Sequence, residues 1–454
     1  MRNMLIKNKT ELVSKGFIKG RKILLDLVEQ ALEEINYYNI IKEITKLEEN
    51  VLTIKNLKLN LTEFDNIYVV GGGKNASAMA LALEEILGNR IKDGVIIEKK
   101  GCKLRTKKVT LIEGGHPVPD LDSLKGAEKI IEIAKKTNAK DLLFVCVSGG
   151  WTSLTSTPPE RISFEELVKV YDLLLKSGMT LEQMNVIRNH LSRLGRGRIP
   201  ITASKATVIG LIAVDEIGGK PWGPTVPDDS TFSDAIDILK HFDLLEVIPC
   251  SVRYYLEKGS KDEETPKEAD YQKKQIRVHN VVIVNNIDMC NIVKKKAEEK
   301  GINSFLLSTA LEGEAKHVGT VMSSIAKEIA KFSRPFIPPC IVIAGGETTV
   351  TITGKAGEGG RNQEVALSAA QNISGIDNLA ILSIATDGTD GPTDIAGAIV
   401  DGTTMRRAKV LKIDVVEEIK NHNTSYVFKK IKDAIYTYNT GTNLMDLIVM
   451  YFGL

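Results

Sequence analysis

A short, almost wholly apolar run followed by a glycine-rich turn and then a helical stretch recurs along this chain. Before residue 215 the runs are residues 67–70, 94–97, 109–112, 142–147 and 208–214. Strands that are apolar at every position are typical of sheets covered by helices on both faces, because neither face meets water. The pattern therefore predicts an α/β protein whose first domain is a Rossmann-like, doubly wound parallel sheet.

A polar segment interrupts this pattern between residues 258 and 275. Its sequence, KGSKDEETPKEADYQKKQ, is highly charged and almost without apolar residues, which is typical of a linker or a long surface loop. Strand-like runs then resume at residues 281–284, 304–307, 341–344 and 379–384. A chain of 454 residues also exceeds what one hydrophobic core usually serves. We therefore predict an N-terminal domain over residues 1–275 and a smaller C-terminal α/β domain over residues 276–454.

Charge and cysteine content disfavour several classes of protein. Sixty Lys and Arg residues against 58 Asp and Glu residues leave a net charge of +2, without a basic stripe, so no nucleic-acid partner is expected. The five cysteines lie far apart without a C-x-x-C pair, as expected for buried thiols in a reduced, cytoplasmic protein. No apolar stretch has the length of a membrane span, and the first residues lack the apolar core of a secretory signal. We expect a cytoplasmic monomer or homodimer.

The turn after the first predicted strand reads Gly71-Gly72-Gly73-Lys74-Asn75-Ala76 and leads into a predicted helix over residues 77–87. Glycines let backbone N–H groups approach an anion, and a helix N-terminus adds partial positive charge. The turn also fits the dinucleotide fingerprint G-x-G-x-x-A, which keeps a nicotinamide cofactor as an alternative. Lys74 inside the turn favours phosphates or carboxylates instead. A tight turn with a solvated lysine is an equally open interpretation.

Two further segments of the first half are candidates for a ligand site. Ser148-Gly149-Gly150 follows the strand predicted over residues 142–147, and ligands bind outside the carboxyl ends of strands in such sheets. Asn185 and Arg188 lie on one strip of a helix predicted over residues 181–194, beside its apolar side. A plain loop and an ordinary boundary row of a helix are the alternatives.

The second half contains the segment with the strongest local chemistry. Residues 354–364 combine four glycines with Arg361 and Asn362 at the start of a predicted helix, and Glu347 lies shortly before them. A glycine-rich anion cradle beside a guanidinium is suited to stabilising a transferring phosphoryl group.

A loop rich in aspartate follows the strand predicted over residues 379–384. It contains Asp387, Asp390 and Asp394. Mg²⁺ takes carboxylate and phosphate oxygens, so the loop is a candidate metal site. A turn held by Asx hydrogen bonds is the alternative.

Together these motifs resemble the MOFRL-type glycerate kinases, also called glycerate 2-kinases. The matching segments follow the family's order from about residue 70 to the C-terminus: GGGKNASAMA, HPVPD, SGG, NVIRNHLSR, GPTVPDDST, GEA, GGETTV, GEGGRNQE, DGTDGPTDIAGA and TGTN. The resemblance implies phosphoryl transfer from ATP to D-glycerate, giving 2-phosphoglycerate, with Mg²⁺ and with the active site in a cleft between the two domains.

By position in these motifs, Lys74 and Arg361 resemble the family's catalytic cations. Arg188 and Asn185 are candidates to hold the glycerate carboxylate, since Arg suits bidentate contacts. The substrate- and nucleotide-binding residues that we expect are Gly72, Gly73, Ser148, Gly149, Gly150, Asn185, Arg188, Glu347, Gly359, Gly360 and Asn362. The metal ligands that we expect are Asp215, Asp387 and Asp390.

The chain departs from the family pattern at several of these loops. Trp151 replaces a glycine and would either plug the pocket or form one of its walls. Gly195 and Arg196 occupy a segment that has lost the family's lysine. Gly219 and Lys220 replace two acids in a loop that is also shorter than in the family. Tyr438 and Asn439 replace a Gly-Pro pair. Two alternatives therefore stay open, an NAD(P)-dependent hydroxypyruvate reductase and a relative that binds a sugar acid with altered or no activity.

Overall fold

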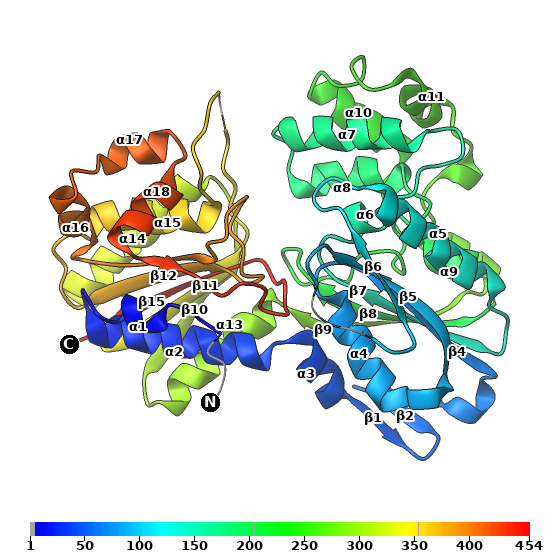
Figure 1. Cartoon of the computed structure of the whole chain (residues 1–454), viewed down its shortest axis with the longest axis horizontal. Coiled ribbons are helices and arrows are strands. Elements are labelled where there is room, and N and C mark those ends of the chain that lie inside the picture. The colour runs from blue at the N-terminus through cyan, green and yellow to red at the C-terminus, as the bar shows by residue number, and fades with distance from the viewer. Residues whose placement is uncertain (1–4, 103, 105, 204, 353) are drawn as a thin grey trace. The chain divides into compact units, whose positions relative to one another are not determined.

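The computed structural model describes residues 5–102, 104, 106–203, 205–352 and 354–454, which form two compact units (Figure 1). The parallel-sheet unit comprises Tyr37–Val214 and Pro221–Ile283, and the mixed-sheet unit comprises Met1–Asn36, Asp215–Lys220 and Val284–Leu454. Each unit has a six-stranded sheet packed against helices. The predicted α/β class with two domains is confirmed.

The parallel-sheet unit is built on the strand order β6-β5-β4-β7-β8-β9. Counted along the chain this order is 3-2-1-4-5-6, which is that of dinucleotide-binding doubly wound sheets. The four pairings from β6 to β8 are parallel. The bounds are β4 (Asn66–Gly72), β5 (Ile91–Lys99), β6 (Thr110–Gly114), β7 (Asp141–Val147), β8 (Thr207–Val214) and β9 (Arg277–Asn285). All five strands expected before residue 215 are present.

Helices cover both faces of this sheet, which explains why β7 and β8 are buried at every position. Helices α5 and α9 share one hydrophobic core with the sheet, and α4 packs on β4, β5 and β7 (Figure 1). Their bounds are α4 (Ala76–Leu87), α5 (Leu121–Lys136) and α9 (Arg198–Thr202).

A second core in the same unit lies among helices that are not part of the sheet layers. The long apolar side chains of these helices pack on one another, with Tyr171 and Ile187 fully buried. Those helices are α7 (Phe164–Lys176), α8 (Leu181–His190), α10 (Phe232–His241) and α11 (Cys250–Lys258). The remaining elements are α3 (Tyr37–Ile44), β1 (Thr45–Glu48), β2 (Val51–Ile54), β3 (Leu57–Asn60), α6 (Trp151–Leu154), α12 (Glu268–Lys274) and 3₁₀ turns at Leu61–Glu63, Gly88–Arg90 and Lys261–Glu263.

The mixed-sheet unit has the strand order β10-β11-β15-β12-β13-β14. Only β10 and β11 run parallel, because the last strand, β15, inserts antiparallel between β11 and β12. The strands are β10 (Asn303–Leu311), β11 (Cys340–Gly346), β12 (Leu379–Ala385), β13 (Gly397–Asp401), β14 (Ala434–Ile435) and β15 (Asp446–Phe452).

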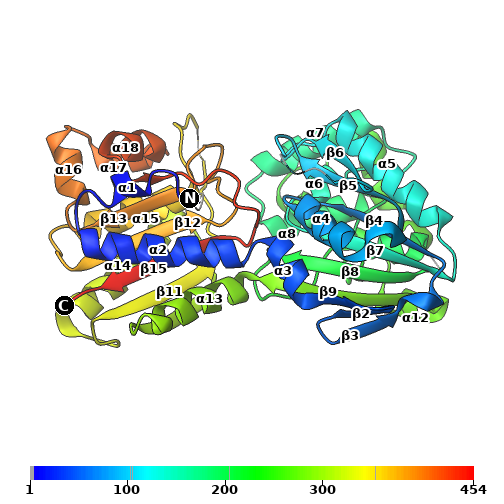
Figure 2. The ribbon, with the colours of Figure 1, turned by 60° about the horizontal axis from the view of Figure 1, so that its bottom comes forward.

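Helices α14 and α15 pack on the mixed sheet, and α2 lies along β12 and β15, beside α13 (Figure 2). The helices of this unit are α1 (Lys9–Leu12), α2 (Ile18–Glu34), α13 (Asn286–Glu299), α14 (Ala315–Phe332), α15 (Arg361–Asn372), α16 (Thr404–Val410), α17 (Val415–Lys420) and α18 (Thr424–Ile431). Among the described residues, no helix is both long enough and apolar enough to cross a bilayer.

The division into units differs from the boundary predicted at residue 275, because α2 docks on the sheet formed near the other end of the chain. Its fully buried Arg21 forms ion pairs with Asp401 and Asp433, which are also fully buried. A buried guanidinium needs such carboxylates to offset its lost hydration. This cluster therefore fixes the N-terminal helix in the mixed-sheet unit.

The segment predicted as a linker, residues 258–275, is instead part of the parallel-sheet unit. It folds into a 3₁₀ turn and α12, and Tyr271 of α12 is only 5% exposed. The Tyr271 hydroxyl donates a hydrogen bond to the Gly197 carbonyl at 2.8 Å. A single buried aromatic thus anchors a segment whose composition is otherwise that of a solvated loop. The following strand, β9, extends the first sheet rather than beginning a new domain.

Candidate functional site

Two of the predicted loops meet at the point where the strand order of the parallel sheet reverses. Strands β4 and β7 are neighbours there, and the turn at Lys74 and the loop Ser148–Gly150 leave their carboxyl ends. The Lys74 N–H donates to the Gly149 carbonyl at 2.7 Å, and the Ser148 hydroxyl donates to the Lys74 carbonyl at 2.9 Å. Ligands of doubly wound sheets bind in the crevice at this reversal, outside the strand ends. The structure thus places Lys74 at the position where this architecture forms a site.

The backbone of the Lys74 turn does not form the anion cradle that its glycines suggested. The buried Glu98 carboxylate, at the end of β5, accepts hydrogen bonds from the N–H groups of Asn75 at 2.7 Å and Ser77 at 3.2 Å. Burial raises the pKa of Glu98, although these hydrogen bonds oppose the shift. The N-terminus of α4 is therefore already occupied by a carboxylate of the protein itself.

Gly72 and Gly73 are explained by packing rather than by a ligand. A Cβ atom on Gly73, whose φ is +120°, would overlap the Ser148 carbonyl. A Cβ atom on Gly72 would lie 2.5 Å from the Thr155 methyl group. Real side chains do not tolerate such distances, so glycine is required for the two loops to approach each other.

The Ser148–Gly150 loop has the free backbone donors that the Lys74 turn lacks. Within the described parts of the chain, no acceptor lies in hydrogen-bond range of the N–H groups of Gly149 and Gly150. Gly150 has the left-handed conformation (φ +88°), and consecutive N–H groups at such a turn form an anion-binding concavity. The His116 ring lies against Gly150, 2.9 Å from where a Cβ atom would be. The N–H groups of Gly149 and Gly150, both expected as binding residues, are thus the backbone donors of this region that have no acceptor within the described residues.

Trp151 lies in the hydrophobic core beneath these loops. It is 3% exposed, packs with Val147 and Leu154, and donates its indole N–H to the Leu194 carbonyl at 3.1 Å. Its ring also reaches within 3.5 Å of the Cβ position of Gly72. Of the two roles expected for Trp151, plug or pocket wall, the structure shows neither, because the indole supports the Lys74 turn from below.

Asn185 and Arg188 lie one turn apart on α8, which begins with the predicted capping box of Thr180 and Gln183. Arg188 is 4% exposed, and its guanidinium lies over the Tyr171 ring at 4.8 Å. Burial lowers the pKa of Arg188, and Tyr171 only partly offsets this. The helix ends at His190, short of the predicted residue 194.

In the mixed-sheet unit, Arg361 is the first residue of α15 and is held by two carboxylates. Its Nε and Nη2 atoms donate to Asp446 at 2.7 and 3.1 Å, and its Nη1 atom lies 2.7 Å from Glu347. Burial opposes the charged form, but Asp446 and Glu347 raise the pKa of Arg361 above its ordinary value. Asp446 was not predicted as a site residue, although an acid at the start of an otherwise apolar strand is an available signal.

Asp390, expected as a metal ligand, caps the N-terminus of α15 instead. Its two oxygens accept hydrogen bonds from the N–H groups of Asn362 at 3.0 Å and Gln363 at 2.9 Å. Burial and the charge of Asp446 raise the pKa of Asp390 to about 6. The Asn362 side chain links this cap to Asp446, at 2.8 Å from its Nδ2 atom.

Gly359 and Gly360 allow the loop to pass close to this cap. A Cβ atom on Gly360 would overlap the Asp390 carboxyl group, and one on Gly359 would lie 2.6 Å from the Thr424 hydroxyl oxygen. These glycines, like those at Lys74, are therefore needed for close packing of the chain on itself.

The other two expected metal ligands, Asp215 and Asp387, each accept a hydrogen bond within the mixed-sheet unit. Asp387 accepts the Thr389 N–H at 3.0 Å in an Asx turn, and Asp215 accepts the Asn443 side-chain amide at 3.0 Å. Among the residues that the structure describes, no three His, Cys, Asp or Glu side chains form a group that could hold a metal ion. A closed protein cage for Mg²⁺ is thus not present, whereas a site completed by nucleotide phosphates needs only one or two carboxylates.

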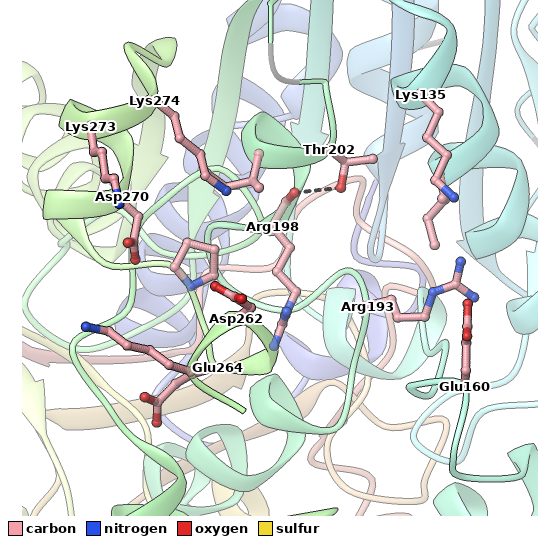
Figure 3. Close-up of a pocket in the computed structure, with 14 residues that line it drawn as sticks. Lys135, Glu160, Arg193, Arg198, Thr202, Asp262, Glu264, Asp270, Lys273 and Lys274 are labelled. Carbon is pink, nitrogen blue, oxygen red and sulfur yellow. Dashed lines mark hydrogen bonds between the residues drawn. The ribbon is translucent and has the colours of Figure 1, made fainter. Parts of the chain in front are cut away.

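A pocket of about 340 Å³ lies elsewhere in the parallel-sheet unit (Figure 3). It is lined by charged groups of both signs, including Lys135, Glu160, Arg193, Arg198 and Asp262. Thr202 donates a hydrogen bond to the Arg198 carbonyl across its wall at 2.9 Å. None of the predicted site residues lines this pocket.

Two family models and several known proteins match this chain. Residues 23–257 match a domain of unknown function (DUF4147), and residues 340–446 match the MOFRL family. The glycerate 2-kinase of Pyrococcus horikoshii is 39% identical over 94% of this chain and 96% of its own length. A protein of Agrobacterium vitis named as a hydroxypyruvate reductase is 33% identical over 85% of this chain and 87% of its own length.

The crystal structure of glycerate kinase from Thermotoga maritima superimposes with a TM-score of 0.79, at 35% identity, over 95% of this chain and 99% of the other. The matched parts of these relatives and structures cover both units of the chain. The chain therefore belongs to the glycerate 2-kinase family of phosphotransferase enzymes.

Proposed function

We propose that this protein transfers a phosphoryl group from ATP to D-glycerate and releases 2-phosphoglycerate. The observation that carries the proposal is the junction of the Lys74 turn with the Ser148–Gly150 loop at the reversal of the parallel sheet. This junction combines an amine with two unused backbone N–H groups, which suits a phosphate or a carboxylate. The kinase names of the relatives select phosphoryl transfer among the reactions that such a site permits.

In this proposal the protein acts mainly by positioning and electrostatics, as phosphoryl transfer requires. The Lys74 ammonium and the Arg361 guanidinium offset negative charge that develops on the transferred group, and the N–H groups of Gly149 and Gly150 bind an anionic oxygen. Glu347 and Asp446 fix the orientation of Arg361. Mg²⁺ bound to the nucleotide phosphates supplies further neutralisation, and Asp215 or Asp387 is the proposed protein ligand.

One observation argues against the reductase alternative. A dinucleotide fold uses the acid at the end of its second strand to bind the ribose and leaves the first helix N-terminus free for the pyrophosphate. Here the acid at that place, Glu98, turns back and caps α4 itself. Both parts of a nicotinamide site are thus already engaged within the protein.

The test is a steady-state assay of ADP release with D-glycerate, with the product identified by phosphorus NMR. Lys74→Ala and Arg361→Ala should each lower kcat/KM by at least about 100-fold, the scale of one lost charge stabiliser. Lys125→Ala, on the exposed face of α5, is the matched control and should retain parental kinetics.

Near-native turnover in either variant, with folding checked by circular dichroism, would remove that residue from the mechanism. Arg361→Lys separates charge from geometry, since it keeps the cation but loses the two-pronged contact with Asp446. Oxidation of NADH with hydroxypyruvate, without ADP release from ATP and glycerate, would refute the kinase proposal.

A further inference from the structure

The guanidinium of Arg188 is buried without a counter-charge. Its residue is 4% exposed, and its Nε and Nη2 atoms have no hydrogen-bond partner in the described parts of the chain. The other deeply buried arginine, Arg21, has two carboxylates, Asp401 and Asp433. Because an isolated buried charge is strongly unfavourable and Arg stays protonated in proteins, a partner from outside the chain is expected for Arg188.

The two unpartnered atoms define what that partner is. Nε and Nη2 form one edge of the guanidinium, and this edge donates two parallel N–H groups to a carboxylate. Arg361 shows the same geometry in this protein, because its Nε and Nη2 atoms both donate to Asp446. The buried, unpaired edge of Arg188 therefore has the donors for a carboxylate, and no carboxylate among the described residues pairs with it.

Asn185 provides a second buried polar atom without a hydrogen-bond partner among the described residues, beside the guanidinium of Arg188. Its side-chain oxygen is buried and has no donor among the described residues. Residues three apart on a helix are neighbours, so this acceptor lies on the same side of α8 as Arg188. An acceptor next to a carboxylate site fits a hydroxyl group of the same ligand.

The surroundings of Arg188 hold it in place without neutralising it. The Tyr171 ring lies under the guanidinium at 4.8 Å, a cation–π contact that keeps the charge and forms no hydrogen bond with the Nε–Nη2 edge. The Tyr171 hydroxyl donates to the Thr152 carbonyl at 3.3 Å, in the helix that directly follows Gly150. The arginine is thus connected to the segment that carries the backbone donors of the candidate site.

We propose that the Nε–Nη2 edge of Arg188 binds the carboxylate of the substrate and that the Asn185 side-chain oxygen accepts a hydrogen bond from a substrate hydroxyl. This pair restricts the acceptors to hydroxycarboxylic acids. The inference rests on the proposed function for its catalytic readout, but the binding of D-glycerate alone tests it separately.

The first experiment compares Arg188→Met with the parent by calorimetric titration of D-glycerate without nucleotide. We expect the parent to bind and Arg188→Met to bind at least about 30-fold more weakly, the loss expected for charge-assisted hydrogen bonds. In turnover assays the KM for glycerate should rise by a similar factor while the KM for ATP stays unchanged. Arg188→Lys keeps the positive charge but lacks the two parallel N–H donors, so its affinity for D-glycerate should lie between those of the parent and Arg188→Met.

Arg193→Met is the matched control. Arg193 follows on the same segment but pairs with Glu128 at 2.7 Å on the surface, so its loss should leave glycerate binding unchanged. Glycerol and glyceramide, which lack the carboxylate, should be poor ligands of the parent. Arg188→Met should no longer discriminate between glycerate and glyceramide.

Urea unfolding distinguishes a ligand-binding role of Arg188 from a role in stabilising the fold. Arg188→Met removes an unpaired buried charge, so its urea midpoint should equal or exceed that of the parent. A lowered midpoint together with unchanged glycerate affinity would overturn the proposal, as would loss of binding in Arg193→Met. If glycerate binds through Arg188 but no ADP forms from ATP, the kinase proposal fails and the carboxylate site stands.

Discussion

The two tryptophans of the chain, Trp151 and Trp222, allow a matched test of how the candidate loops are supported. Both lie in the hydrophobic core of the parallel-sheet unit, at 3% and 7% exposure. The Trp151 indole donates to the Leu194 carbonyl, whereas the Trp222 indole N–H is buried with no acceptor in the described residues. Replacing each by Phe removes the same atoms from the same core and differs only in the hydrogen bond.

The expected difference in the free energy of unfolding follows from that bond. Trp151→Phe leaves the Leu194 carbonyl without its donor, which costs about 1–3 kcal/mol beyond the loss of ring area. Trp222→Phe removes a donor that had no acceptor and carries no such loss. We therefore expect Trp151→Phe to be less stable than Trp222→Phe by about 2 kcal/mol.

Urea unfolding followed by fluorescence measures this difference directly, because each variant keeps one tryptophan in the parallel-sheet unit. Glycerate kinetics provide the second readout. Since Trp151 packs below Gly72, Trp151→Phe should lower kcat/KM or leave it unchanged. Equal stability of the two variants would refute the hydrogen-bond argument, and a Trp151 variant faster than the parent would show that the indole obstructs the site.

Three further predictions concern the mixed-sheet unit. Arg21→Met should lower the free energy of unfolding by about 3–5 kcal/mol in urea melts, because two buried carboxylates lose their cation. Arg253→Met, which removes a partly exposed arginine from two surface ion pairs, is its control, and equal losses would contradict the docking of α2. Since the pKa of Asp390 is raised to about 6 in the folded state, its stabilising contribution is greatest below its unfolded pKa of about 3.9 and is lost as the pH rises to 6. Unfolding measured from pH 4 to 7 should therefore show a fall that Asp390→Asn lacks. Gly360→Ala should lower the free energy of unfolding by about 1–3 kcal/mol through overlap with Asp390, and an unchanged urea melt would exclude that overlap.

The strands of the fold could be predicted because their signal is local. An apolar run such as residues 142–147 shows burial on both faces without reference to any other part of the chain. That α2 belongs to the mixed-sheet unit could not be predicted from a local pattern. Its partners Asp401 and Asp433 lie far along the sequence, and no local pattern indicates which carboxylate meets Arg21. The prediction for residues 258–275 failed for the opposite reason, since the high average charge of the segment concealed buried side chains such as Tyr271.

The candidate site was predicted in outline from its glycines, but sequence cannot show why each glycine is needed. Gly360 permits close contact with Asp390, whereas Gly150 exposes a backbone donor, and both occur in similar glycine-rich loops. Asp446 was missed as a site residue because its role depends on pairing across the fold. The prediction for Arg188 could be sharpened only by the structure, since the absence of a carboxylate near it is not visible in the sequence.

The docking of α2 also has a consequence for synthesis of the protein. The parallel-sheet unit is complete once Ile283 has been made, but α2 then still lacks β12 and β15, the strands that cover its apolar face. At about 5–20 residues per second, translation of Val284–Leu454 takes on the order of 10–30 s. During that interval Leu24, Val28 and Leu32 of α2 are without their native neighbours on the nascent chain. We expect a chaperone that binds apolar helices to engage the nascent protein at α2, while the parallel-sheet unit that follows it in the chain has already folded.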